Sequence, residues 1–412
     1  MGYVVGIVVV VVGILASVAL HEVGHMVPAK KFGVLVPDYA VGFGPALWKK
    51  KIGETTYALR AVLLGGYVKI LGMYPPAREG ARTLNRKGRP TLAEEARQAS
   101  AEDLPEGQEA RAFYNLSAPK KIVVMVSGPL MNLLICVVLS AITMIGIGAP
   151  RASTTLAAVS QTVAGASGES AGPAHEAGVR AGDVVESWNG RPIASWSEFH
   201  EAIAASPAGE PQQLGVKRGQ EHLTFEVTPV EGQQGRVVGV TAGFEYVSAS
   251  PADMVAADWQ MFTSTASVVV RLPQAVWNVG RSLFTDDARE ATSVVSVVGV
   301  GRMAGEVTGD PSSLGLRDTR QVVAVLLSLL ASLNMALFVF NLIPLPPLDG
   351  GHIVGACYEW ARGALARARG KADPGPADTA RMVPLTWAVG GVLVAMSVIL
   401  IAADIIKPVS LA

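Results

Sequence analysis

The stretch Ala19-Leu-His-Glu-Val-Gly-His-Met26 closes an uncharged, mostly apolar run that begins at Tyr3. A hydrocarbon core of about 30 Å needs about 20 helical residues to cross it, so this run predicts a membrane-spanning helix. Ionisable side chains are costly at membrane depth and usually serve a function there. The first span therefore indicates both the class of fold and the place where chemistry is to be expected.

Other stretches of the chain are equally apolar. Half of the 412 residues are hydrophobic, and a mean hydropathy of +0.37 is high for a soluble protein of this length. The sequence predicts an α-helical polytopic membrane protein with four transmembrane helices. We expect them at residues 1–28, 122–150, 321–351 and 382–406.

The basic residues predict how the chain is oriented. The 29–121 connection holds 16 of the 34 basic residues and the 349–381 connection holds five, so the positive-inside rule places both in the cytoplasm. The long 151–321 segment then lies outside, because long loops translocate largely regardless of their charge. The zero net charge gives no sign of a nucleic-acid partner.

The sequence predicts two different structures for the connection between the first and second spans, residues 29–121. Residues 29–75 have the pattern of a membrane-associated β element, with a hairpin over 40–60 and a further strand over 64–71. Residues 76–121 form a cytoplasmic insert and the approach to the second helix. Because residues 76–112 are polar and rich in Ala, Glu, Arg and Gly, we expect them to be mobile. We expect a cytoplasmic loop over 352–381.

The external segment has one specific pattern, Ala177-Gly-Val-Arg-Ala-Gly-Asp-Val-Val-Glu-Ser-Trp-Asn-Gly-Arg-Pro-Ile193. It resembles the core of a PDZ domain, in which a helix start, a Gly-Asp turn and a strand precede an Asn-Gly hairpin. We therefore expect an extracytoplasmic PDZ-like α/β domain over 153–231, with 197–205 as its peptide-groove helix. Another small module is the alternative. Residues 232–320 are expected to be extracytoplasmic, with amphipathic helices lying on the outer leaflet.

The polar groups of the first span have the spacing of a metal site. His21 and His25 are four residues apart and share one face of a helix, so both imidazoles can reach one ion. Glu22 is placed to take a proton from a metal-bound water. The alternative is a polar cap at the membrane interface, but that reading leaves the H-E-x-x-H spacing to chance.

A catalytic zinc site typically has three protein ligands, so another residue must complete the pair. The third span runs parallel to the first, and its end returns to the same side at Asn341-Leu-Ile-Pro-Leu-Pro-Pro-Leu-Asp-Gly-Gly351. Its prolines cannot continue a regular helix. We therefore expect Asp349 to be the third ligand, with His352 as its competitor. Two histidines and a carboxylate favour Zn²⁺.

Together these motifs resemble those of the site-2 protease family, which comprises zinc intramembrane metalloproteases. The PDZ-like region makes the chain similar to the bacterial group that cleaves membrane-bound anti-sigma factors. Gly65-Gly-Tyr-Val-Lys-Ile-Leu71 resembles the family's membrane re-entrant β element. Ser127-Gly-Pro-Leu-Met-Asn132 contains its G-P-x-x-N motif. The single PDZ-like module and the polar insert depart from some relatives.

The resemblance implies a metalloendopeptidase of the bacterial plasma membrane. It would cleave single-span membrane proteins, expected to be anti-sigma factors already cut by an upstream protease, with its active site toward the cytoplasm and with lipid around it. A zinc-activated water would attack the peptide bond, with Glu22 as general base and His21, His25 and Asp349 as zinc ligands. Substrate contacts are expected from Asn341, Asn132 and an edge strand with Gly65, Gly66, Tyr67 and Val68.

Two other functions fit parts of the sequence. One is a membrane-anchored zincin that cuts cytoplasmic loops, although the sequence has no large zincin domain beside the motif. The other is a non-enzymatic PDZ membrane scaffold in which the polar cluster is structural. Zinc content distinguishes the scaffold from an enzyme, and the position of cleavage distinguishes the two proteases.

Overall fold

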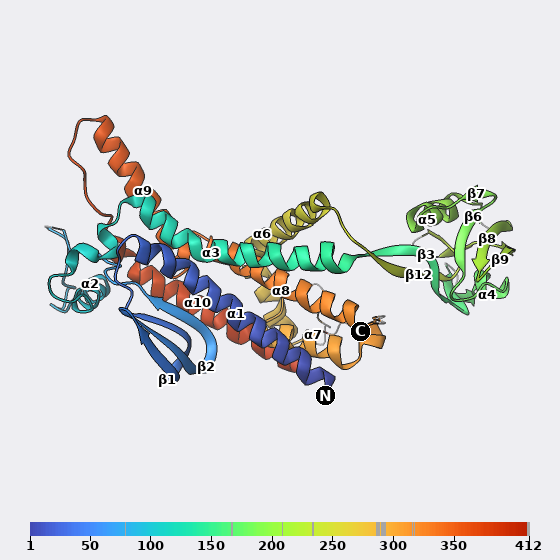
Figure 1. Ribbon diagram of the computed structural model, residues 1–412, viewed down its shortest axis with the longest axis horizontal. Coiled ribbons are helices and arrows are strands. Elements are labelled where there is room, and N and C mark those ends of the chain that lie inside the picture. Colours follow the sequence, from blue (N-terminus) through green and yellow to red (C-terminus); the bar gives the residue numbers. More distant parts are fainter. Residues whose placement is uncertain are drawn as a thin grey trace. The chain divides into compact units, whose positions relative to one another are not determined.

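The computed structural model describes residues 1–409 except 79, 166–167, 208, 233–234, 286–288, 290–293, 315 and 317. The chain divides into two compact units (Figure 1). Unit 1 consists of Met1–Thr143 together with Pro251–Ala412, and unit 2 consists of Met144–Ser250.

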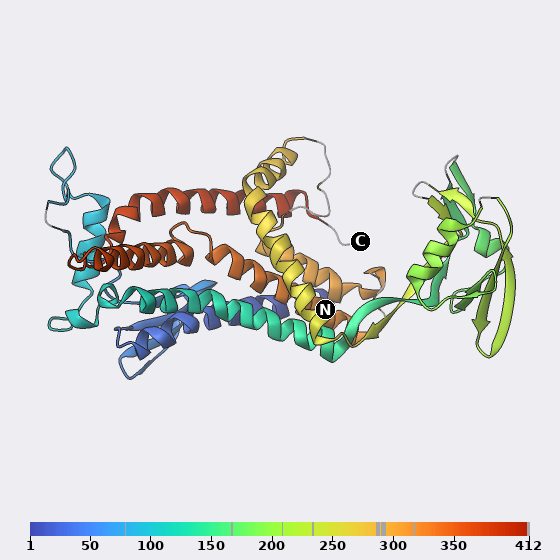
Figure 2. The ribbon, with the colours of Figure 1, turned by 90° about the horizontal axis from the view of Figure 1, so that it is seen from above.

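Unit 1 contains the four apolar helices that the sequence predicts. Each is long and apolar enough to cross a membrane, and they run roughly parallel to one another (Figure 2). The first three pack on one another, whereas the fourth packs on the two helices that follow unit 2 in the chain. They are α1 (Gly2–Lys31), α3 (Ala118–Ser140) with its π-helical continuation η3 (Ala141–Gly148), α8 (Thr319–Asn341), and α10 (Val383–Ile406) preceded by η5 (Thr379–Met382). Helices α1 and α3 approach closely, since a Cβ on Gly24 would lie 2.5 Å from the carbonyl oxygen of Ser127. Small residues commonly permit such contacts between membrane helices.

The third span is shorter than expected, and the predicted loop after it is largely helical. Helix α8 ends at Asn341, and a new helix, α9 (Asp349–Ala368), fills most of 352–381. The three prolines between them cannot supply the N–H groups that would continue α8. The chain therefore turns and starts a second helix at Asp349.

The β element consists of two long, strongly bent strands, β1 (Asp38–Ile52) and β2 (Thr55–Lys69). Residues 46–52 and 55–60 form the expected hairpin. The further strand is not separate, because β2 continues and folds back so that Tyr39 pairs with both Tyr57 and Val68. Within the described strands, residues 66–69 pair only with 38–41. The end of β2 is therefore an edge of this sheet.

The polar insert holds more regular structure than the sequence predicts. It contains α2 (Leu92–Glu102), η1 (Glu109–Arg111) and η2 (Phe113–Asn115). The hydroxyl of Thr91 caps α2 by accepting a hydrogen bond from the backbone of Glu94. Arg97 is 5% exposed and donates to both carboxylate oxygens of Asp378 at 2.7 and 2.8 Å. This buried ion pair attaches the insert to the segment before α10, which a composition-based expectation of mobility does not capture.

The chain returns from unit 2 through two helices, α6 (Pro251–Ser282) and α7 (Val297–Gly309), with η4 (Pro311–Leu314) after them. Helix α6 packs against α8 and α10, while its Trp259 and Trp277 remain exposed. Helix α7 packs on α1, where a Cβ on Gly6 would lie 2.1 Å from the carbonyl oxygen of Ala304.

Unit 2 contains two sheets. The first has the order β12-β3-β6-β8-β9, with β7 paired to β6, and the second has the order β11-β10-β4-β5. Helices α4 (Pro173–Glu176) and α5 (Trp196–Ala205) accompany them. The strands are β3 (Ala149–Val159), β4 (Thr162–Gly165), β5 (Gly168–Ala171), β6 (Val184–Trp188), β7 (Arg191–Pro192), β8 (Gln212–Arg218), β9 (Glu221–Val227), β10 (Val230–Gly232), β11 (Gly235–Val237) and β12 (Val240–Val247).

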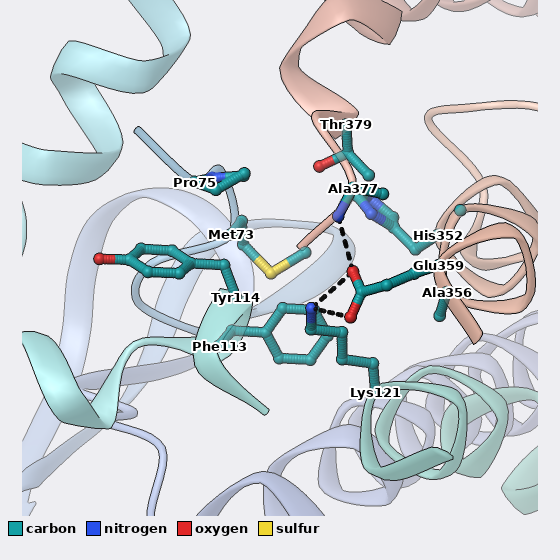
Figure 3. A pocket seen from close by; sticks show the side chains of 11 residues that line it. Met73, Pro75, Phe113, Tyr114, Lys121, His352, Ala356, Glu359, Ala377 and Thr379 are labelled. Carbon is teal, nitrogen blue, oxygen red and sulfur yellow. Dashed lines mark hydrogen bonds and ion pairs between the residues drawn. The ribbon is translucent and has the colours of Figure 1, made fainter. Parts of the chain in front are cut away.

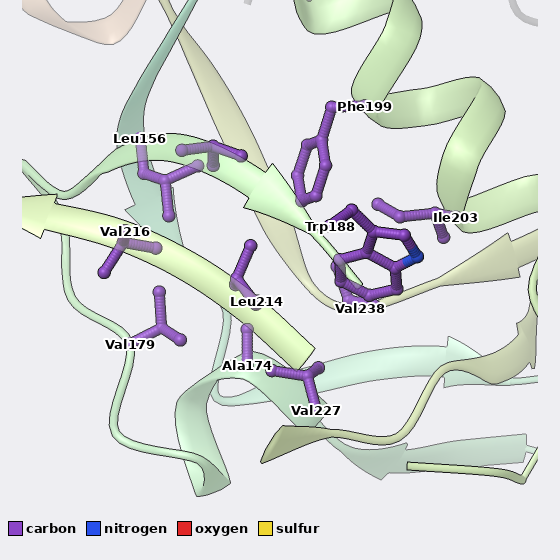
Figure 4. Packing of buried hydrophobic residues seen from close by; sticks show 11 residues of the cluster. Leu156, Ala174, Val179, Trp188, Phe199, Ile203, Leu214, Val216, Val227 and Val238 are labelled. Carbon is purple, nitrogen blue, oxygen red and sulfur yellow. The ribbon is translucent and has the colours of Figure 1, made fainter. Parts of the chain in front are cut away.

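The core of unit 2 is built from α5 and the larger sheet (Figure 4). Phe199 of α5 contacts Trp188 of β6 edge to face, with 5.6 Å between the ring centroids. The unit is larger than the expected 153–231, because β12 pairs with β3 along its length, from Val240 with Val159 to Val247 with Ala149. The first part of the expected 232–320 region therefore belongs to this sheet.

Candidate active site

The two histidines of the first span converge. They lie one turn apart on α1, and their Nε2 atoms are 3.2 Å apart. His25 is buried, with 4% of the residue exposed. Because residues at i and i+4 lie on one helix face, both ring edges point away from α1 toward the same place.

Asp349 completes a triangle of ligand atoms. Its Oδ2 lies 3.3 Å from Nε2 of His21 and 3.3 Å from Nε2 of His25. Tetrahedral zinc with ligands at about 2.0–2.1 Å separates them by about 3.3–3.4 Å. Asp349 Oδ2 is shielded from solvent and accepts no hydrogen bond within the described chain. The donor set, its spacing and this unsatisfied oxygen all fit zinc.

Local structure explains how Asp349 reaches this position. It is the first residue of α9, directly after the turn at which α8 stops. A Cβ on Gly350 would lie 2.1 Å from the carbonyl oxygen of Ile343, and one on Gly351 would lie 2.6 Å from the nitrogen of Pro346. Only glycines fit this turn, so the Asp-Gly-Gly sequence is what lets the carboxylate come back toward α1.

Helix α3 holds the histidines from the opposite side. Nδ1 of His25 lies 2.8 Å from the carbonyl oxygen of Val124, and a carbonyl can only accept, so this nitrogen carries the proton. A Cβ on Gly128 would lie 2.1 Å from Nε2 of His25, so the ring occupies space that this glycine leaves. Asn132, 1% exposed, places its Nδ2 3.1 Å from Nδ1 of His21.

A cavity of about 500 Å³ opens beside these groups. Glu22 lines it together with the three ligand residues. The edge of β2 forms another wall. The lining residues are His21, Glu22, His25, Tyr67, Val68, Lys69, Ile70, Met73, Met125, Pro347, Asp349 and His352.

A narrower cavity shares two wall residues, Met73 and His352, with the first (Figure 3). Burial lowers the pKa of His352, which favours its neutral ring. Below it, Lys121 of α3 forms an ion pair with Glu359 of α9, with Nζ–O distances of 2.7 and 2.8 Å. Glu359 also accepts from the backbone N–H of Ala377 at 2.8 Å. This network ties α3, α9 and the segment before α10 together beside the site.

Comparison with known proteins identifies the family. A sequence model of Peptidase family M50 matches residues 9–372. The chain belongs to peptidase family M50.

Several curated M50 relatives align along most of the chain. Zinc metalloprotease Rip1 of Mycobacterium tuberculosis is 31% identical over 441 residues, which cover 100% of both chains. Metalloprotease MmpA of Caulobacter vibrioides is 27% identical over 352 residues, 83% of each chain. Regulator of sigma-W protease RasP of Bacillus subtilis is 24% identical over 403 residues, 84% of this chain and 88% of the relative.

These relatives confirm the resemblance to site-2 proteases. They make the protein a zinc-dependent metalloendopeptidase. Together with the four apolar helices, they also make it a multi-pass membrane protein.

The structure separates the residues predicted for this M50 peptidase into groups. His21, His25 and Asp349 form the only potential three-ligand cluster in the described part of the chain, and His352 is not a member of it. Tyr67 and Val68 line the cavity. A Cβ on Gly66 would lie 3.5 Å from Cγ of Glu22, whereas Gly65 forms a bend with φ of 99°.

The two asparagines differ from one another in position. Asn341 is the last residue of α8, and Asn132 contacts His21. Neither is among the described residues that line the cavity. The role of Val124 and Gly128 beside His25 was not predicted from the sequence. Their spacing with Asn132, at 124, 128 and 132, was the available signal, since it places all three on one face of a helix.

Proposed function

We propose that this M50 peptidase hydrolyses peptide bonds within or near the transmembrane segment of single-span membrane proteins. The observation that carries the proposal is the triangle formed by His21, His25 and Asp349. It lies at the end of an apolar helix and shares its cavity with Glu22 and the edge of a β-sheet.

The roles of the site residues follow from their chemistry. His21, His25 and Asp349 hold zinc, which when bound makes water acidic enough to ionise near neutral pH and polarises the scissile carbonyl. Glu22 accepts the proton of the attacking water and then returns it to the leaving amine. The carboxylate is suited to this because it lies in the same cavity and follows His21 directly on α1.

The substrate backbone requires a partner once its helix unwinds, because unpaired amides are costly in a membrane. Residues 66–69 offer an unpaired strand edge at the cavity wall. We assign the binding of an extended substrate segment to this edge by β-augmentation, and we keep Asn341 as a further substrate contact near the end of α8.

The basic connections 29–121 and 349–381 favour a cytoplasmic position for the zinc end of the helices. Unit 2 is then extracytoplasmic. Its Gly-Asp turn, its Asn-Gly hairpin and the following helix α5 support a PDZ-like assignment. We propose that unit 2 excludes substrates whose external part is untrimmed. We propose regulated intramembrane proteolysis of anti-sigma factors as the process, and the relative RasP, named a regulator of sigma-W protease, supports a link to sigma factors.

The test uses purified full-length protein and a single-span model substrate. Glu22→Gln is expected to retain zinc and to lose cleavage by at least about a hundredfold, because it removes the general base. His21→Ala and Asp349→Ala are expected to lose both zinc and cleavage. A fully active Glu22→Gln protein would exclude the mechanism.

The same experiment distinguishes the alternatives. A scaffold would bind no stoichiometric zinc and would leave the substrate intact. A membrane-anchored zincin would cut the cytoplasmic loops of the substrate and would spare its membrane segment. The position of cleavage, determined by mass spectrometry of the products, decides between the two proteases.

A further inference from the structure

One face of α3 contacts both histidines of the zinc cluster at their Nδ1 sides. Val124, Gly128 and Asn132 are spaced four residues apart and therefore lie along one face of the helix. The carbonyl of Val124 fixes Nδ1 of His25, and Gly128 makes room for the His25 ring. Asn132 stands opposite Nδ1 of His21. Nδ1 of His25 therefore faces a carbonyl oxygen of α3, whereas Nδ1 of His21 faces the side-chain amide of Asn132.

The ring of His21 needs a hydrogen-bond acceptor at this place. Its Nε2 points to Asp349 and His25, at 3.3 and 3.2 Å, and must be unprotonated to bind a metal. A neutral imidazole carries a single N–H, which is then on Nδ1. Nδ1–H requires an acceptor, and the amide of Asn132 contacts Nδ1 at 3.1 Å.

The amide of Asn132 is able to supply that acceptor. Its Oδ1 is buried and has no hydrogen-bond partner among the described residues. A half-turn of the amide about its Cβ–Cγ bond exchanges oxygen and nitrogen and brings Oδ1 to Nδ1–H of His21. The exchange satisfies an orphaned oxygen and removes the contact between two nitrogens.

We propose that Asn132 is a positioning residue for zinc. Its amide oxygen accepts the Nδ1–H of His21, which holds the ring in the tautomer whose Nε2 binds the metal. The inference rests on the proposed zinc site and changes the role of Asn132 from a substrate contact to a support of a ligand. Removing such a partner of a metal-binding histidine typically lowers metal affinity about 10–100-fold.

The structure offers a matched control. Asn334 of α8 is also buried, 0% exposed, and also has an unpartnered Oδ1. Its Nδ2 donates to Oγ of Ser17 on α1 at 2.9 Å, one turn before His21. Asn132 and Asn334 therefore have the same residue type, burial and partner helix, but only Asn132 touches the zinc cluster.

The experiment measures zinc affinity by chelator competition on full-length protein in detergent, and the visible spectrum of the Co²⁺-substituted protein. Asn132→Leu is expected to weaken zinc binding about 10–100-fold and to alter the Co²⁺ spectrum. Asn132→Asp, whose carboxylate is a better acceptor, is expected to bind zinc at least as tightly as the wild type. Asn334→Leu is expected to keep both the affinity and the spectrum, whatever its effect on thermal stability.

Three results would overturn the inference: unchanged zinc affinity in Asn132→Leu, an equal loss in Asn334→Leu, or a tenfold loss in Asn132→Asp. The result for Asn132→Asp remains decisive if Asn132→Leu does not fold. Failure of the proposed function is a separate outcome, since in that case the wild-type protein itself binds no stoichiometric zinc.

Discussion

His25 sits in a recess of α3 that a side chain at Gly128 would fill. Gly128→Ala would place a Cβ 2.1 Å from Nε2 of His25. The His25 ring must then leave the zinc cluster, or α1 and α3 must separate. We expect this variant to lose zinc affinity by at least about tenfold, measured by chelator competition. Gly146→Ala is the control on the same span, because a Cβ at that position would have nothing within 4 Å of it. Equal affinity in both variants would contradict the close fit.

The Gly-Asp turn of unit 2 depends on one carboxylate. Asp183 is 1% exposed, and burial would raise its pKa. The guanidinium of Arg218, at 2.7 and 2.8 Å, and the backbone N–H of Arg180, at 2.9 Å, instead hold that pKa below its usual range. Since the folded-state pKa lies below the unfolded one, the pair stabilises unit 2 at neutral pH. This stabilisation declines as pH falls from about 4 through the folded-state pKa.

Arg218→Ala is expected to destabilise unit 2 more than Asp183→Asn at pH 7, because the first change leaves a buried carboxylate without its cation. Hydrogen exchange in β6 and β8 should accelerate by about tenfold or more in Arg218→Ala. The difference between the two variants should shrink as pH falls toward about 4, because without the guanidinium burial raises the pKa of Asp183 and the carboxylate takes up a proton. Equal exchange rates at pH 7 would contradict the assigned ion pair.

At the scale of elements, α2 is attached by a buried side chain. Arg97 also pairs with Glu94 within α2 and connects the helix to Asp378. Asp103, which follows the helix, pairs with Lys69 on the edge of β2 at 2.5 Å. Arg97→Ala should detach α2 and accelerate limited proteolysis within 76–112 by about tenfold, because it removes one partner of a buried pair. The exposed Arg86→Ala is the control, and equal cleavage rates in the two variants would refute the attachment.

The two edges of the small sheet differ in what they face. Residues 67–69 lie at the cavity wall, whereas Lys50 lies on the exposed opposite edge. In a Glu22→Gln, Cys357→Ser background, Val68→Cys should form a disulfide with a cysteine placed near the scissile bond of a bound substrate. Lys50→Cys should not. Cysteine retains the backbone N–H of residue 68, so the strand edge itself is preserved.

Gel electrophoresis without reductant measures the cross-linked product. Comparable yields at the two positions would contradict binding of the substrate along residues 66–69. Zinc content, measured in parallel, checks that the Val68→Cys variant keeps its metal site.

At the scale of the whole molecule, the first and last strands of unit 2 pair with each other. Ala149 of β3 and Val247 of β12 are direct partners, so a short linker can replace 149–247. We expect this deletion to keep zinc and the cleavage of trimmed substrates, and to gain cleavage of untrimmed ones. Immunoblotting of both substrate forms measures the result. Slow cleavage of the trimmed substrate would indicate instead that unit 2 binds the substrate.

The sequence by itself determined the four spans, the H-E-x-x-H face and the break before Asp349. Each of these depends on local properties: hydropathy over about 20 residues, the four-residue repeat of a helix, and the missing N–H of proline. The sequence also predicted that Asp349 lies on the same side of the membrane as His21. The third span runs parallel to the first, so both spans end on that side.

Only the tertiary structure decided which groups touch. It showed that β2 folds back to form a free edge, that α2 and α9 are helices fastened by the Arg97–Asp378 and Lys121–Glu359 ion pairs, and that α3 lies against the histidines. Such contacts depend on how each helix is rotated about its own axis and on packing between residues far apart in the chain. Neither is encoded in a local pattern, so Asn132 could be recognised as part of a motif but not as a neighbour of His21.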